Sequence, residues 1–197
     1  MSRVEALVMH YAAPAICGIK PSNLFSVKES DLRLGSGTLA KFADEFRTEG
    51  LTVAVLRRQC GNTLLFVYDK RLLEEILKIP GAEEYLAEKG YRVSEGISSV
   101  LSEMFGRICA GKDFPHEIGL FLGYPLRDVI LFDRKSGTGC EYSGYWKSYG
   151  DTEKAKAACT LYRECSGKCC ELYRQGKRIS EIRRSYRTAG AKICGSN

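Results

Sequence analysis

Apolar residues recur at helical spacing in two stretches near the start of the chain. Residues 2–13 ("SRVEALVMHYAA") place them on one helical face, and Pro14 disfavours a continuing helix. Residues 38–50 ("TLAKFADEFRTEG") repeat the pattern and end at a glycine, which is a common helix stop. Between them, a loop rich in Gly, Pro, Ser and Asn leads into a short predicted strand at 24–27.

The pattern then changes from helical to extended. Residues 51–58 ("LTVAVLRR") and 63–69 ("TLLFVYD") are runs of β-branched and aromatic residues, separated by "QCGN". Two such runs around a Gly-Asn turn predict a β-hairpin. The second run is apolar at successive positions, which predicts a strand covered on both faces.

From residue 70 onward the spacing of apolar residues is again helical. We therefore predict an α+β fold, with a small sheet of about three strands including the hairpin, packed with six to eight helices. We expect a single domain over 1–197. Within it, 1–69 forms a mixed α/β part and 70–197 a mainly helical part with basic C-terminal helices.

Residues 109–132 resemble a helix-turn-helix in shape, because Gly123 could make the turn and Gly119 would allow two helices to approach closely. A recognition helix must also present polar side chains to base edges. Here Arg127 is the one such side chain among largely aliphatic outward positions. The sequence therefore favours a packed bend over a DNA-reading motif.

Composition indicates a soluble globular protein. The chain is 44% hydrophobic and 27% charged, and it has no apolar run of the roughly 20 residues that a membrane span needs. The start of the chain does not resemble a signal peptide, so we expect a cytoplasmic protein without membrane association. Residues 151–197 carry 11 basic and 5 acidic residues, which accounts for the net charge of +6. One alternative function is therefore a nucleic-acid or partner-binding module using this basic segment.

The nine cysteines leave a second alternative, a thiol- or metal-dependent redox or sensor protein. Their odd number and the missing export signal argue against a disulfide framework. In the helix predicted after residue 151, Cys165 and Cys169 fall on the buried stripe, whereas Cys159 and Cys170 point elsewhere. Four thiols on one helix do not easily converge on one zinc ion, so we predict no metal ligands; Cys140 or a histidine from outside would be needed.

Three strings together are similar to a known family. They are "HYAAPAICGIKPSNLF" (10–25), "FPHEIGLFLGYPLRDV" (114–129) and "CEYSGYWKSYGDTEKA" (140–155). The chain resembles members of the bacterial domain-of-unknown-function 3793 family, and the likeness covers nearly its whole length. The resemblance implies a small stand-alone cytosolic protein, found mainly in anaerobes, and it supplies no activity. Tyr11 stands where the family often has a cysteine.

These strings also contain the residue types from which a site is built. His10, Lys20, His116 and Glu117 would form an acid–base or anion-binding cleft if the fold brings them together. A second set could bind an aromatic or phosphate-bearing ligand: Asn23, Tyr124, Tyr145, Trp146 and Lys147. In the loop at 144–149, the rings of Tyr145, Trp146 and Tyr149 could equally pack that loop onto the core.

The leading hypothesis is therefore a protein that binds an anionic or aromatic small molecule, with enzymatic turnover left open. The sequence names no cofactor and no oligomeric state.

Overall fold

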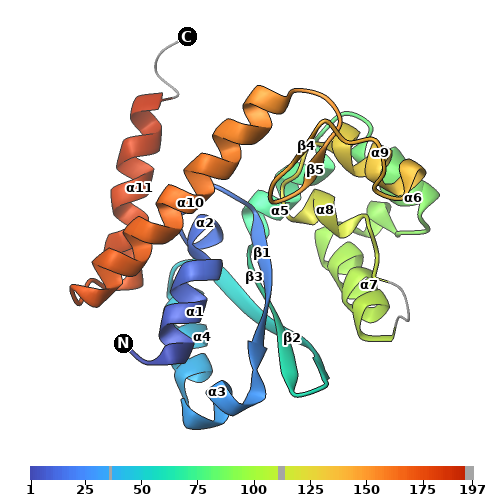
Figure 1. Cartoon of the computed structure of the whole chain (residues 1–197). Helices are drawn as coiled ribbons and strands as arrows, with labels where there is room; N and C mark the ends of the chain where they lie inside the picture. The colour runs from blue at the N-terminus through green and yellow to red at the C-terminus, as the bar shows by residue number, and fades with distance from the viewer. Residues whose placement is uncertain (36, 111–113, 194–197) are drawn as a thin grey trace. The chain divides into compact units, whose positions relative to one another are not determined.

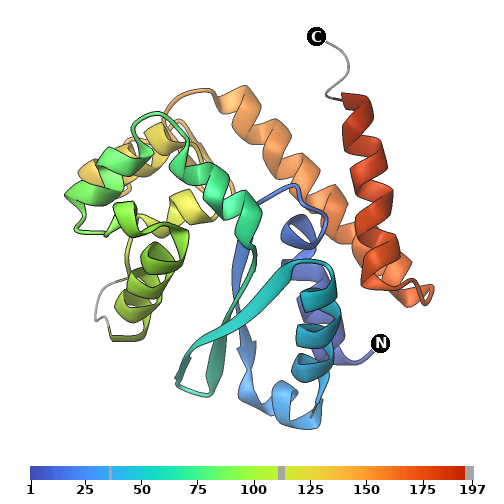
Figure 2. The same cartoon turned by 180° about the vertical axis from the view of Figure 1, so that it is seen from behind.

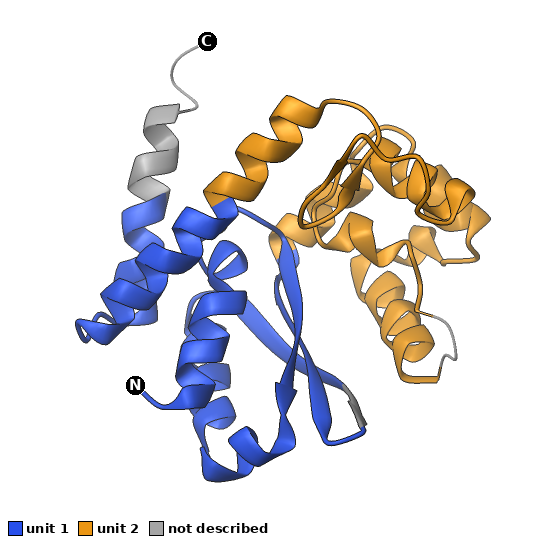
Figure 3. Ribbon diagram, in the orientation of Figure 1, with its two compact units in different colours: residues 1–70, 162–197 blue, residues 71–161 orange. Residues whose placement is uncertain are grey.

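The computed structural model describes residues 1–35, 37–110 and 114–193, and within these ranges it leaves the side chains of 57–59 and 187–193 undescribed. The described chain divides into two compact units (Figure 3). The first contains residues 1–70 and 162–197, and the second contains residues 71–161. The C-terminal helices therefore belong to the same unit as the N-terminal part of the chain. The single-domain prediction stays a prediction.

The first unit is built on a three-stranded antiparallel sheet (Figure 1). Its strand order is β1-β3-β2, so the strand that is apolar on both faces lies in the centre, as its pattern indicates. Its elements are α1 (Arg3–Tyr11), α2 (Ala13–Ile16), β1 (Ser22–Lys28), α3 (Glu29–Leu34), α4 (Thr38–Thr48), β2 (Leu51–Gln59), β3 (Asn62–Asp69), the later part of α10 (Thr152–Arg174) and α11 (Ile179–Ile193).

Helices α1 and α4 lie on one face of this sheet in both views (Figures 1 and 2). Phe42 and Phe46 of α4 are buried against it, as the helical spacing predicts. From the C-terminal segment, Ile179 and Ile182 complete the same core. A buried ion pair joins Arg183 of α11 to Asp69 at the end of β3, so the two distant parts of the chain share both apolar and ionic contacts.

The second unit is helical, with one short hairpin. Its elements are α5 (Lys70–Leu77), α6 (Ala82–Glu88), the 3-10 turn Val93–Glu95, α7 (Ile97–Ala110), α8 (Ile118–Phe121), α9 (Leu126–Lys135), β4 (Tyr142–Ser143), β5 (Lys147–Ser148) and the first part of α10. Strands β4 and β5 pair antiparallel. The core of the second unit includes Leu86, Val100, Met104 and Phe121, each fully buried.

The α+β class and the three-stranded sheet with its hairpin are confirmed. Two details differ from expectation. Among the described residues there are eleven α-helices rather than six to eight, because short pieces such as α2 and α8 stand as separate four-residue helices. The hairpin turn uses Cys60 and Gly61, with φ of 51° and 71°, and Asn62 already begins β3. Hairpin turns of this kind need positive φ at both central residues.

The bend between α8 and α9 is a packed corner, as predicted. Gly123 turns the chain with a φ of 77°. A Cβ at Gly119 would lie 3.0 Å from a methyl of Val129, so glycine allows α8 to approach α9 closely without displacing that side chain. Helix α8 has only four residues, all buried, which leaves no exposed first helix for a DNA-binding motif.

Among the described residues, none of the helices combines the length and the apolar character that crossing a bilayer requires.

Candidate functional site

The second unit contains a pocket of about 390 Å³ that lies entirely within residues 114–147. The segment before α8, the α8–α9 corner and the β4–β5 hairpin form its walls. Its lining residues are Phe114, His116, Ile118, Gly119, Leu122, Tyr124, Asp128, Val129, Phe132, Ser143, Gly144, Tyr145, Trp146 and Lys147. Five of these are sequence-predicted site residues, and they come from two strings that are separated along the chain.

One wall of the pocket is a stacked aromatic pair. The rings of Tyr124 and Trp146 are 5.0 Å apart between centroids and inclined by 21°. The indole Nε1–H of Trp146 donates to Asp128 Oδ2 at 2.8 Å, and the backbone N–H of Tyr149 donates to Asp128 Oδ1 at 2.9 Å. Asp128 is only 4% exposed, and these two bonds fix the hairpin against the first turn of α9.

A close backbone approach shapes the hairpin that carries Trp146. The Gly144 N–H donates to the carbonyl of Trp146 at 3.0 Å and closes the turn. A Cβ at Gly144 would lie 2.6 Å from Cys159 Sγ and 2.8 Å from the Tyr142 ring, distances that no side chain tolerates. Glycine therefore allows the turn to press against α10 and to present Tyr145 and Trp146 at the pocket.

The pocket is also lined by two basic side chains, Lys147 and His116. Lys147 Nζ donates to the Gly137 carbonyl at 2.7 Å and lies 5.9 Å from the centre of the Phe132 ring. His116 Nδ1 lies 3.6 Å from Asp133 Oδ1, and the other oxygen of Asp133 pairs with Lys89.

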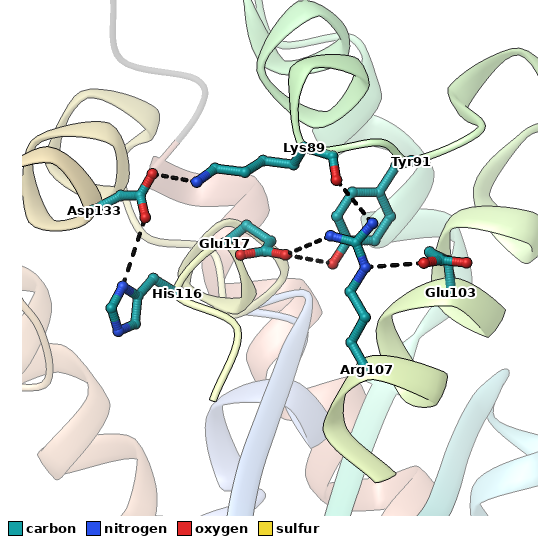
Figure 4. A network of polar contacts seen from close by, with 7 residues as sticks. All are labelled: Lys89, Tyr91, Glu103, Arg107, His116, Glu117 and Asp133. Atoms are coloured by element: carbon teal, nitrogen blue, oxygen red, sulfur yellow. Dashed lines mark hydrogen bonds and ion pairs between the residues drawn. The ribbon is translucent and has the colours of Figure 1, made fainter. Parts of the chain in front are cut away.

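Glu117, the residue after His116, belongs to the same polar network, which Lys89 connects to Asp133 and His116 (Figure 4). It is 5% exposed, and its Oε1 accepts from Tyr91 Oη at 2.9 Å and from Arg107 Nη1 at 3.1 Å. Arg107 also donates to Glu103 at 2.9 Å and to the Lys89 carbonyl at 2.8 Å. Burial raises the pKa of Tyr91, and the nearby Glu117 carboxylate adds to that rise.

The contacts of Glu117 indicate a structural role. Its carboxylate holds α7 and the loop after α6 to the start of α8, while His116 lines the pocket.

The remaining predicted residues lie in the first unit. His10 is exposed at the end of α1, with its ring edge-on to Tyr11. Lys20 is 3% exposed, and its Nζ lies 5.1 Å from the centre of the Tyr162 ring. Asn23 is buried, and its Oδ1 accepts from the Ala15 N–H at 3.0 Å, which ties α2 to β1. No single unit contains all four acid–base candidates, so their joint site stays a prediction.

Three cysteines of the first unit form the one cluster among the described residues that matches metal-ligand spacing. They are Cys17, Cys165 and Cys169, and all are buried. The predicted burial of Cys165 and Cys169 is confirmed. Cys159 and Cys170, which we expected to point elsewhere, are also buried, at 1% and 6% exposure. The prediction of no metal ligands did not consider Cys17, which no local pattern links to α10. Cys194 lies outside the described residues.

Sequence reasoning also missed Asp128, which orients Trp146. A signal was present, because an acidic residue in the first turn after Pro125 fits a helix start. The carboxylate instead accepts the indole N–H of Trp146, which lies 18 positions later in a hairpin. Local sequence pattern does not reveal a contact of this kind.

Comparison with known proteins gives one match. No curated protein and no solved structure shows significant similarity to the chain. A family model, described as "Protein of unknown function (DUF3793)", matches residues 8–183 and thus most of the chain, both units included. The chain therefore belongs to the DUF3793 family.

Proposed function

We propose that this chain binds a small, flat aromatic molecule that carries an acidic group, in the pocket of residues 114–147. The observation that carries the proposal is the stacked Tyr124–Trp146 pair, anchored by Asp128 beside a cationic lysine. Pockets that are mostly apolar, with a few convergent polar groups, are the usual form of small-molecule sites.

The aromatic wall supports a ring-shaped ligand. Offset or edge-on packing against Tyr and Trp rings contributes about 0.5–1.5 kcal/mol beyond the burial of area. Asp128 fixes the Trp146 ring through its indole N–H, and the ring of Tyr124 stacks on it. Because this wall is held in place before a ligand arrives, little conformational freedom remains to be lost on binding.

The charges support an acidic group on that ring. Lys147 brings an ammonium group to the pocket, and its bond to the Gly137 carbonyl leaves further N–H donors on the same nitrogen. His116 adds an imidazole on the same lining. Asp128, the acidic residue of the wall, has an N–H donor from the hairpin on each of its oxygens.

Trp146 provides the test, because it is the single tryptophan of the chain. Its fluorescence should change saturably when the protein is titrated with benzoate or nicotinate. The neutral benzamide should bind ~10-fold more weakly, since it loses one charge-assisted hydrogen bond. Cyclohexanecarboxylate, which has the charge without the flat ring, should also bind more weakly than benzoate.

Two matched lysine variants test whether the charge of Lys147 in the pocket accounts for the preference for benzoate over benzamide. Lys147→Gln should remove the difference between benzoate and benzamide. Lys154→Gln changes an exposed lysine of α10 that pairs with Asp151, and it should leave that difference intact. Equal effects of the two substitutions, or no saturable response to any aromatic acid, would contradict the proposal.

A further inference from the structure

Three thiols from distant parts of the sequence meet inside the first unit. Cys17 directly follows α2, whereas Cys165 and Cys169 lie one turn apart on the same face of α10. Their Sγ atoms all lie within 4.8 Å of one another, and those of Cys17 and Cys169 are 3.0 Å apart. None of the three is more than 4% exposed, and none is in a disulfide.

The distances between the three Sγ atoms are close to the sulfur–sulfur distance of a tetrahedral metal centre. With a Zn–S bond of about 2.3 Å, two sulfurs on one tetrahedral zinc ion are about 3.8 Å apart. The observed separations, from 3.0 Å to at most 4.8 Å, bracket that distance. Small shifts of side-chain rotamers are therefore enough to bring all three sulfurs onto one ion.

Burial alone does not explain the group. A buried cysteine often acts as a small hydrophobic residue, and Cys170 fits that description because it is buried in the same core without joining the three sulfurs. Cys17, Cys165 and Cys169 instead point their only polar atoms at one another.

The three thiols hydrogen-bond to one another, and Tyr186 adds a hydrogen bond to Cys165. The three sulfurs therefore contact one another directly and not only the surrounding apolar side chains.

The backbone beside Cys17 is held in place. Arg183 of α11 donates to the carbonyl of Ile16 at 2.8 Å and also pairs with Asp69 of β3. This buried arginine fixes the segment that carries Cys17 independently of the sulfurs. A preformed position for each ligand is what a specific metal site needs.

We propose that Cys17, Cys165 and Cys169 form a binding site for one Zn²⁺ ion, with water as the fourth ligand. Each thiol gives its proton to solvent when its sulfur binds, so one Zn²⁺ that takes all three sulfurs releases three protons and leaves one net negative charge. Cu⁺ on the same three thiolates would leave two, and burying that charge costs more. Three sulfur ligands with an open fourth position match the donor types that zinc prefers.

Oxygen-free titration of the reduced, chelator-treated chain tests the proposal. Zn²⁺ should bind with one equivalent per chain, raise Tm because it binds the folded state, and release protons to a pH indicator. Co²⁺ as a substitute should give the thiolate-to-cobalt absorption band of a sulfur-ligated site. Cys17→Ser and Cys165→Ser should each weaken Zn²⁺ binding by at least ~100-fold, because each removes a direct ligand, and loss of even an outer hydrogen-bond partner costs about 10- to 100-fold.

Cys159→Ser is the matched control. Cys159 is a buried cysteine of α10 outside the cluster, so its replacement also buries a hydroxyl while leaving the three sulfurs intact. It should keep full affinity for Zn²⁺. Equal weakening in Cys159→Ser and Cys17→Ser, or the absence of a one-to-one complex in the unsubstituted chain, overturns the proposal.

A second experiment uses the unsubstituted chain, so its result does not depend on whether a cysteine variant folds. In the unsubstituted chain, Zn²⁺ should protect Cys17, Cys165 and Cys169 from iodoacetamide under mildly denaturing conditions, as peptide mapping would show, while Cys60 stays reactive. Lack of protection contradicts the site. A Cys17–Cys169 disulfide in air-free protein overturns metal binding altogether.

Discussion

Asp128 shows how one side chain determines the shape of the candidate pocket. Its two oxygens accept an indole N–H and a backbone N–H from the hairpin. Asp128→Ala should lower the free energy of unfolding by about 2–3 kcal/mol, because two buried donors lose a charged acceptor. The emission of Trp146 should also shift to the red as its ring gains freedom.

Urea unfolding followed by circular dichroism measures the first effect, and a fluorescence spectrum of the folded protein measures the second. Asp44→Ala is the control, since Asp44 is an exposed partner of Arg47 whose loss should cost below about 1 kcal/mol. A spectrum of Asp128→Ala that matches the unsubstituted protein would show that Asp128 does not position Trp146.

Glu117 is predicted to act on stability rather than on ligand binding. Glu117→Gln leaves the charge of Arg107 with a weaker acceptor, and we expect a loss of about 1.5–3 kcal/mol in the free energy of unfolding. Benzoate affinity should change less than twofold relative to the unsubstituted chain. The comparison variant is Glu103→Gln, whose more exposed carboxylate pairs with the same arginine. A large loss of affinity with unchanged stability would instead return Glu117 to the binding site.

Glu5 gives a pH-dependent prediction at the start of α1. The backbone N–H of Ser2 lowers the pKa of the Glu5 carboxyl below its usual 4.5, and Tyr173 and Lys41 add to the effect. Because the pKa is lower in the folded state, the stabilisation is present above pH 4.5 and is lost as pH falls through the folded-state value.

Glu5→Gln should therefore cost about 0.5 kcal/mol at neutral pH and nothing measurable at low pH. Urea unfolding of both chains between about pH 7 and about pH 3 measures the difference. A gap that stays constant across this range would show that the charge of Glu5 does not stabilise α1.

At the scale of elements, the β4–β5 hairpin depends on Gly144. Gly144→Ala places a Cβ against Cys159 and Tyr142, so the turn must move. We expect a loss of about 1–3 kcal/mol in stability and weaker benzoate binding, because the hairpin carries Trp146 and Lys147. Gly106→Ala in α7 is the matched control, since open space surrounds a Cβ there and helix propensity favours alanine by roughly 0.5–1 kcal/mol. If both alanines were tolerated equally, the close approach at Gly144 would have no structural importance.

Elements were predictable where a periodic pattern extends over several turns. The helix of residues 38–48, strand β3 and the buried stripe of α10 each bury the side chains that their spacing indicates. Strands β4 and β5 are two residues long, too short for an alternating pattern, and their pairing depends on the close approach at Gly144. The sequence therefore predicted an aromatic loop at this position without its hairpin.

Sites were predictable only in part, because proximity between distant segments leaves no local signal. The strings "FPHEIG" and "GYWKSYG" were both expected to carry a site, and their residues line one pocket. Lys20 was predicted with the acid–base set and Asn23 with the ligand-binding set, and both belong to the other unit. The meeting of Cys17 with Cys169 joins positions 152 residues apart, which no spacing rule reveals.

At the scale of the whole molecule, the chain forms two compact units with separate candidate sites. Residues 71–161 have their own buried core, including Leu86, Val100, Met104 and Phe121. We expect this segment, produced alone, to fold and to unfold cooperatively on heating, as circular dichroism would show. It contains Trp146, so it should also keep the fluorescence response to benzoate. A segment that lacks a cooperative transition would support folding of the chain as one domain.

The most direct test of the account is the NMR signal of the Trp146 indole N–H during a titration with benzoate. Because the chain has one tryptophan, this signal belongs to the pocket wall without further assignment. We predict a saturable shift of this resonance, accompanied by backbone shifts concentrated in residues 114–149, and a smaller response to benzamide. A resonance that stays unmoved while benzoate saturates, or shifts confined to residues outside this range, would contradict a ligand site at this pocket.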